Sequence, residues 1–217
     1  MLDLISILPE LSRYNKMKIL GSGKSITKYS VEDVVEENAF YVVLNHFDVI
    51  AGLEGISSKP ILFFAHDYYG QRFDSIVAKK KFKFFLNLNN VYAFLHAKEI
   101  NHQNCCTKVT YPQERLAWIK NLYFYEKAQS NVSYFESTTN SLLGFSSTLH
   151  SPLSLVIGND FISEVHLYGL DLYIYQSLIR FDNANVGRDA SIIFNANKLL
   201  LNYLNTKRQN LKIAFFN

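Results

Sequence analysis

Two stretches far apart in the sequence join an apolar run to glycines and polar side chains that could bind a ligand. The first is Lys18-Ile-Leu-Gly-Ser-Gly-Lys-Ser25, and the second is Glu164-Val-His-Leu-Tyr-Gly-Leu-Asp-Leu-Tyr173. A buried strand that ends in a glycine turn presents backbone N–H groups to which a phosphate can bind. We therefore expect the two turns to line one nucleotide site.

The first turn does not match the two common phosphate-binding motifs. Its end, Gly23-Lys24-Ser25, is that of a P-loop, but the position of the first P-loop glycine holds Lys18. In the dinucleotide-binding pattern G-x-G-x-x-G, the third glycine position is occupied by Ile26. The sequence therefore predicts a shorter glycine turn that belongs to neither class.

The remaining reactive residue types indicate no metal site. The six histidines have no metal-ligand spacing, and no Asp-x-Asp motif is present. The two cysteines, Cys105 and Cys106, are adjacent, which suits neither a disulfide between them nor a zinc site. We expect a reducing, cytoplasmic setting and no bound metal.

Composition is typical of one globular domain over residues 1–217. Hydrophobic residues make up 48% of the chain and aromatic residues 15%, which allows a packed core. The net charge of +3 does not favour a nucleic-acid partner, although it permits an anionic ligand or an acidic membrane surface. The N-terminus lacks the basic region of a signal peptide, and no apolar run reaches the length of a membrane span. The lysine run 79–81 is interpreted as a solvated edge or as a contact for anionic lipid.

Strand and helix patterns alternate along the chain and must position these turns. Strands are predicted at residues 16–20, 40–44, 60–65, 82–88, 132–135, 164–168 and 211–216. Helices are predicted at residues 2–13, from Ser30 onwards, at 71–79, 113–127 and 190–207, and from an N-cap at Ser151 to about residue 158. This alternation predicts an α/β fold with a single doubly wound, mostly parallel Rossmann-like sheet flanked by helices.

In such a sheet the ligand lies beyond the carboxyl ends of the strands. The predicted strand ends carry Gly21-Ser-Gly23, Asn45-His46, His66-Asp67 and Gly169-Leu-Asp171. We expect these polar residues to share one edge.

Four of these segments resemble a known enzyme family when they are taken together, in order and in approximate spacing. They are Ile-Leu-Gly-Ser-Gly-Lys-Ser-Ile26, Val-Leu-Asn45-His-Phe, Phe-Phe-Ala-His66 and the stretch from Glu164 to Tyr173. They are similar to segments of the bacterial CMP-sialic-acid-dependent sialyltransferases, glycosyltransferase family 42. Related turns occur in Kdo and Maf-type glycosyltransferases. The resemblance implies a sialyltransferase-like variant of the GT-A fold.

The resemblance also implies roles for individual residues. The donor, a CMP-activated sugar, would be bound by Gly21, Ser22, Gly23, Ser25, Asn45, His66, Ser151, Gly169 and Asp171. Catalytic roles would fall to His150, Tyr173, Tyr175 and Arg188. No separate cofactor is implied.

One segment departs from the family pattern. The histidine base of the family lies in a Gly-His-Ser segment before the last helix, whereas this chain has Val186-Gly-Arg-Asp189 there, after a short lid at 174–188. His150 and His66 are then the candidate bases. The alternative is a catalytically silent relative that serves as a binding or assembly subunit, or a transferase that uses another nucleotide sugar.

The resemblance implies an inverting, metal-independent transfer of sialic acid or a Kdo-like sugar to a surface glycan. The acceptor would be a lipooligosaccharide or a capsule, so the enzyme would work at the cytoplasmic face of the membrane as a peripheral protein. The sequence does not give the oligomeric state, for which a homo-oligomer is one expectation.

Overall fold

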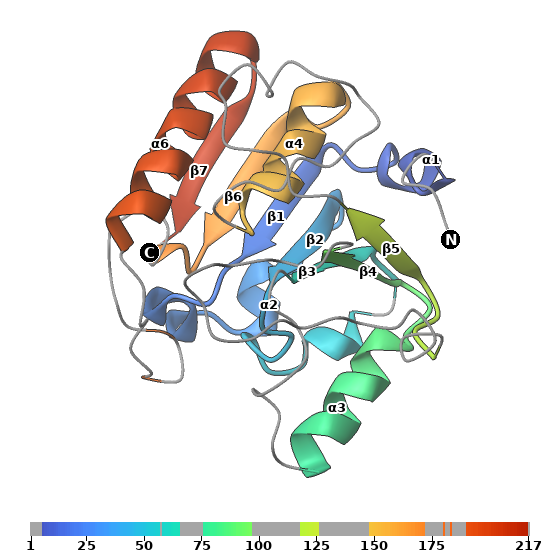
Figure 1. Ribbon diagram of the computed structural model, residues 1–217. Coiled ribbons are helices and arrows are strands. Elements are labelled where there is room, and N and C mark those ends of the chain that lie inside the picture. The colour runs from blue at the N-terminus through green and yellow to red at the C-terminus, as the bar shows by residue number, and fades with distance from the viewer. Residues whose placement is uncertain are drawn as a thin grey trace.

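The computed structural model describes residues 6–56, 58–65, 76–96, 118–125, 148–171, 180, 183 and 190–216. Seven strands form one sheet in the order β5-β4-β3-β2-β1-β6-β7, and every neighbouring pair is parallel (Figure 1). The strands are β1 (Lys16–Leu20), β2 (Ala39–Leu44), β3 (Ile61–Ala65), β4 (Val91–His96), β5 (Leu122–Tyr125), β6 (Glu164–Tyr168) and β7 (Lys212–Phe216).

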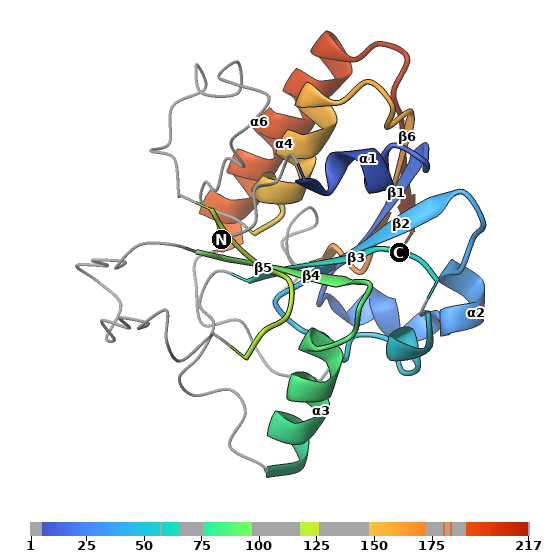
Figure 2. The same cartoon turned by 90° about the vertical axis from the view of Figure 1, so that its right-hand side faces the viewer.

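Helices cover both faces of this sheet. They are α1 (Leu8–Leu11), α2 (Val31–Val34), α3 (Ile76–Leu86), α4 (His150–Gly158) and α6 (Ala190–Lys207), with 3-10 turns η2 (Lys24–Lys28) and η3 (Leu53–Gly55). Figure 2 shows α1, α4 and α6 on one face and α2 and α3 on the other. The predicted doubly wound Rossmann-like fold is confirmed, and its strand order reverses between β1 and β6.

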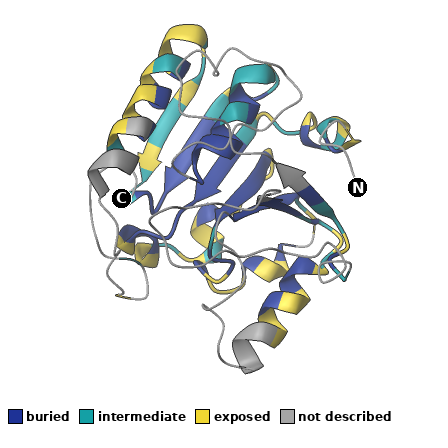
Figure 3. Cartoon of the chain, in the orientation of Figure 1, coloured by how far each residue is buried: buried dark blue, intermediate teal, exposed yellow. Residues whose placement is uncertain are grey.

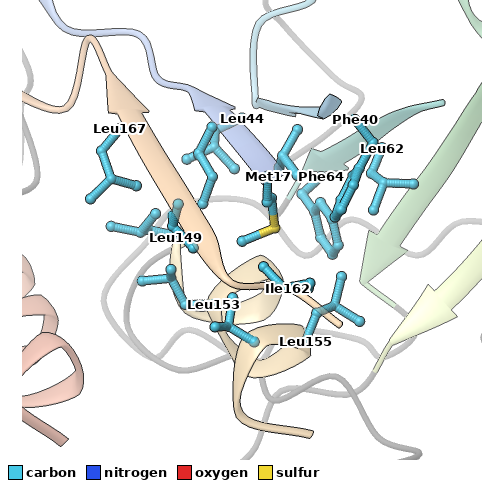
Figure 4. Packing of buried hydrophobic residues seen from close by; sticks show 14 of the residues in the cluster. Met17, Phe40, Leu44, Leu62, Phe64, Leu149, Leu153, Leu155, Ile162 and Leu167 are labelled. Atoms are coloured by element: carbon cyan, nitrogen blue, oxygen red, sulfur yellow. The ribbon is translucent and has the colours of Figure 1, made fainter. Parts of the chain in front are cut away.

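The core has two layers because the central strands are buried on both faces (Figure 3). Along β2, Phe40, Val42 and Leu44 pack in one cluster, and Tyr41 and Val43 pack in the other. Figure 4 shows the first cluster, in which strand side chains meet the leucines of α4. Burial on both faces explains why these strands are continuous apolar runs rather than alternating ones.

Two sequence predictions in the middle of the chain are wrong, and one strand there was missed. Residues 82–86 of the predicted strand 82–88 belong to helix α3, because Phe82, Phe85 and Leu86 are buried at helical spacing while Phe84 is 60% exposed. The predicted helix 113–127 contains strand β5 instead, and strand β4 was not predicted at all. The predicted strand 132–135 lies outside the described residues, as do residues 71–75 of the predicted helix 71–79.

Two helix starts also differ from the predictions. Helix α4 begins at His150 with Leu149 as its N-cap residue, so Ser151 lies inside the first turn and does not cap it. Of the predicted leading helix 2–13, the described part forms only α1. Ser30, in contrast, caps α2 through a capping box with Asp33, at the helix start that the sequence predicted. Among the described residues, no helix is both long and apolar enough to cross a membrane.

Candidate functional site

The glycine turns after β1 and β6 lie side by side at the carboxyl edge of the sheet. Gly21 N–H donates to Tyr168 O at 2.8 Å, and Gly23 N–H donates to Gly169 O at 2.7 Å. These bonds continue the pairing of Leu20 with Tyr168 beyond the ends of the strands. Strands far apart in the sequence thereby bring both turns to the point where the strand order reverses.

The close approach of the two turns accounts for their glycines. A Cβ atom at Gly21 would lie 2.5 Å from Gly169 O, and one at Gly23 would lie 2.8 Å from the amide nitrogen of Asp171. Gly169 has a φ of +62°, and a Cβ there would come within 2.7 Å of the Ile26 Cβ. Contacts within the protein therefore require glycine at all three positions, before any ligand is considered.

Asp171 ties the second turn to the first. Its Oδ2 accepts from Ser25 N–H at 2.5 Å, and its Oδ1 accepts from the Ser25 hydroxyl. Both carboxylate oxygens thus hold the start of η2. The sequence placed Ser25 and Asp171 in one site, but it gave no sign that they bind each other.

Asn45 follows β2 and connects it to the segment that precedes α4. Its φ of +63° lies in the left-handed region, which asparagine tolerates better than most residues. Its backbone N–H donates to Phe64 O at 2.8 Å, and its Nδ2 donates to the Thr148 hydroxyl at 3.0 Å. No sequence motif pointed to Thr148, which the fold brings to this edge.

The first turn of α4 reaches the same edge. Both His150, 2% exposed, and Ser151, 0% exposed, are buried. Within the part of the chain that the structure describes, no group hydrogen-bonds to Ser151 Oγ. The N-terminus of a helix favours negative charge because its first N–H groups lack intrahelical partners. A catalytic base must reach the hydroxyl group of the acceptor. The burial of His150 therefore counts against its predicted role as the base.

Two basic side chains, Lys24 and Arg180, gather beside the first turn. Arg180 forms an isolated antiparallel bridge with Gly23, and its Nη1 lies 3.5 Å from His46 Nε2. Lys24 Nζ donates to Asn183 Oδ1 at 2.5 Å, and Asn183 N–H donates to Arg180 O at 3.0 Å. Two cationic side chains therefore lie at this edge, beside the carboxylate of Asp171. The sequence predicted a site role for neither residue, since Lys24 was considered only as part of an incomplete P-loop motif and Arg180 only as part of the short lid 174–188.

The described site contains nine of the predicted site residues, namely Gly21, Ser22, Gly23, Ser25, Asn45, His150, Ser151, Gly169 and Asp171. All are on the carboxyl edge or at the start of α4. The predicted residues His66, Tyr173, Tyr175 and Arg188 lie outside the described residues, as does the predicted lid except for Arg180 and Asn183. Among described residues, no group of three or more His, Cys, Asp or Glu side chains could hold a metal ion.

A cluster of ion pairs joins β1, β6 and the segment after α2, on the face of the sheet that α2 covers. Lys18 Nζ pairs with Glu36 Oε2 at 2.8 Å, and Lys16 pairs with both Glu36 and Glu164. Burial acts to raise the pKa of Glu36, but hydrogen bonds from Lys16 and Lys18 lower it to about 2. The Nε2 atom of His166 lies 2.7 Å from Oε1 of Glu164. These charges compensate one another inside the fold.

Neither a protein-family model, a curated protein nor a solved structure matches this chain.

Proposed function

We propose that this protein binds a nucleotide sugar at the carboxyl edge between β1 and β6 and transfers the sugar to an acceptor. The observation that carries the proposal is the position of the paired glycine turns, which lie where the strand order reverses. In open α/β sheets, ligands bind in the crevice at this point, beyond the strand ends. Because this fold occurs in proteins of many different activities, the proposed activity depends on the side chains at this edge.

The charge of this edge supports an anionic ligand. Lys24 and Arg180 lie against the first turn, and the start of helix α4 reaches the same edge. Guanidinium groups and helix N-termini both bind phosphate and carboxylate oxygens well. A nucleotide that carries an acidic sugar presents both kinds of anion.

The resemblance to CMP-dependent sialyltransferases makes the proposal more specific. Gly21, Asn45 and Gly169 belong to the segments of this chain that resemble the family, and all three lie at the carboxyl edge of the sheet. We therefore propose a CMP-activated acidic sugar, sialic acid or Kdo-like, as the donor and a surface glycan as the acceptor. A glycan of this kind is built at the cytoplasmic face of the membrane, where the protein would work.

In the proposed reaction, the acceptor hydroxyl oxygen attacks the anomeric carbon of the donor. The bond between that carbon and the phosphate oxygen breaks, and its electron pair leaves with CMP. A base takes the hydroxyl proton, and cationic groups stabilise the departing phosphate. Arg180 and Lys24 are candidates for the phosphate, and His150 is the described candidate for the base.

Calorimetric titration with CMP, UDP and GDP tests this proposal. We expect CMP to bind more tightly than the other two nucleotides. The second measurement is hydrolysis of CMP-sialic acid and CMP-Kdo, with and without glycan acceptors. No binding of any of the three nucleotides would reject the nucleotide site, and a preference for UDP or GDP would reject the CMP donor.

A second candidate function is that of a nucleotide-binding subunit without catalytic activity. It is favoured by the burial of His150 and by Val186-Gly-Arg-Asp189, which stands where the family has its histidine base. This candidate would be supported if the protein binds CMP but turns over no CMP-sugar, and if the affinity for CMP is the same in His150→Ala. Loss of turnover in His150→Ala with CMP affinity retained would support the transferase.

A further inference from the structure

Helix α3 carries an unusual concentration of positive charge. Its sequence, Ile-Val-Ala-Lys-Lys-Lys-Phe-Lys-Phe-Phe-Leu, contains four lysines and no acidic residue. Lys80, Lys81 and Lys83 are exposed to solvent. Lys120, which precedes β5, is exposed as well and donates to Asn89 Oδ1, just beyond the C-terminus of α3.

An aromatic side chain stands among these lysines. Phe84 is 60% exposed, more than any other large hydrophobic residue in the described part of the chain. Lys80 and Lys81 precede it by four and three residues, the spacings that make side chains neighbours on a helix surface. The opposite side of the helix buries Phe82 and Phe85 against the sheet. Packing of α3 therefore does not explain why Phe84 is apolar.

The surface formed by Lys80, Lys81, Lys83 and Phe84 lies at the periphery of the molecule. Figures 1 and 2 show α3 at the margin of the fold, and Figure 3 shows that its outward side is exposed. Lys83 continues the surface towards β5, where its Nζ lies 5.5 Å from the centre of the Trp118 ring. Trp118 is half-buried, and it is the single tryptophan of the chain.

We propose that the exposed side of α3 binds the surface of an anionic phospholipid bilayer. Lysine side chains attract anionic headgroups, and an exposed phenylalanine between them gains by leaving water for the acyl boundary. A nucleic acid would also attract the lysines, but the bilayer accounts for the apolar residue at the centre of the surface as well. This inference does not depend on the nucleotide site.

Trp118 provides a direct measurement of this contact. Vesicles of phosphatidylcholine, alone or mixed with phosphatidylglycerol, are added to the full-length protein, and brominated phosphatidylglycerol serves as the quencher. We expect sedimentation with the anionic vesicles only, together with quenching of the Trp118 emission. Raising the salt concentration should release the protein, because the attraction is screened.

Matched variants separate this surface from charge and apolarity elsewhere. In Lys80→Glu/Lys81→Glu, vesicle affinity should fall about tenfold or more, since two attractive charges become repulsive. The double variant Lys198→Glu/Lys212→Glu changes two exposed lysines of α6 and β7 and should keep its affinity. Phe84→Ser should also weaken binding, and Leu199→Ser, at a residue 54% exposed on α6, should not. Circular dichroism checks that each variant is folded.

Several outcomes would overturn the proposal. They are wild-type protein that stays in solution with anionic vesicles, equal losses in the α3 and control variants, and sedimentation without quenching of Trp118. Retention of labelled RNA or DNA that depends on Lys80 and Lys81, with no binding to vesicles, would assign the surface to nucleic acid instead.

Discussion

Gly169 is one of the three glycines at which the two turns meet, and its backbone is also in the left-handed region. Its φ of +62° disfavours any residue with a Cβ, and that atom would meet Ile26 at 2.7 Å. We predict that Gly169→Ala lowers the free energy of unfolding by about 2 kcal/mol or more. Urea denaturation followed by circular dichroism measures this change.

Gly55 provides the control for that substitution. A Cβ there would meet nothing within 4 Å. Gly55→Ala should change the free energy of unfolding by no more than about 0.5 kcal/mol. Equal losses in the two variants would show that the contact between the turns is not what requires Gly169.

Arg180 tests the ligand chemistry at the scale of one side chain. If its guanidinium binds the phosphate, Arg180→Ala should weaken CMP binding about tenfold, the effect of losing a charged hydrogen bond. Binding of cytidine, which has no phosphate, should hardly change. Arg13→Ala removes an exposed arginine before β1, at the opposite end of the strand, and should leave both affinities unchanged. A parallel loss for CMP and cytidine would indicate a structural role for Arg180.

At the scale of elements, Arg208 joins the end of α6 to the loop between α4 and β6. Its guanidinium donates to the backbone oxygens of Val156, of Asn159 at 3.1 Å and of Ile162 at 2.9 Å. We predict that Arg208→Ala lowers the free energy of unfolding by about 2 kcal/mol.

Arg208→Lys is the informative companion variant. It keeps the charge but cannot reproduce the planar fork of donors, so it should recover only part of the loss. Chemical denaturation of both variants measures the difference. Full recovery by lysine would show that charge near the end of α4, and not the set of four contacts with the carbonyl oxygens of Val156, Asn159, Asp160 and Ile162, is what stabilises this junction.

The elements that could be predicted from the sequence are those with one unambiguous pattern. Strands β1, β2, β3, β6 and β7 are short apolar runs that end at turn residues, and α6 has a long helical period. Residues 82–88 were predicted as a strand because phenylalanine has a high strand propensity. The helical spacing of the buried Phe82, Phe85 and Leu86 was too short a pattern to indicate the helix. Strand β5 was missed because Leu122 continues the helical spacing of Leu116 and Ile119.

The site was predictable in position but not in its internal contacts. Strand ends locate Gly21, Asn45 and Gly169 because parallel strands share one carboxyl edge. The sequence does not show that β6 pairs with β1, and this pairing decides that Asp171 binds Ser25. The place of Arg180 in the site could not be predicted either, since it lies next to Gly23 only in the folded chain.

At the scale of the whole molecule, the sheet separates three kinds of polar group. The paired turns and their cations lie at the carboxyl edge, and Lys80, Lys81 and Lys83 of α3 face solvent at the margin. The charge cluster of Lys16, Lys18 and Glu36 lies on one face of the sheet. The cluster joins β1 to the segment after α2, and Glu164 extends it to β6. Because its charges pair with one another, the cluster contributes to the stability of the fold.

This cluster predicts how the stability of the whole fold depends on pH. The pKa of Glu36 falls from 4.5 to about 2 on folding, so its contribution is complete above about pH 4.5 and is lost as the pH falls towards 2. Because 36% of the Glu36 side chain is exposed, solvent screening limits this contribution to about 1 kcal/mol. Urea denaturation at pH 7 and pH 3 should therefore show a smaller acid-induced loss in Glu36→Gln than in the wild type. The control Glu37→Gln, at an exposed neighbour, should lose as much stability as the wild type, and an equal loss in all three proteins would contradict the assignment to Glu36.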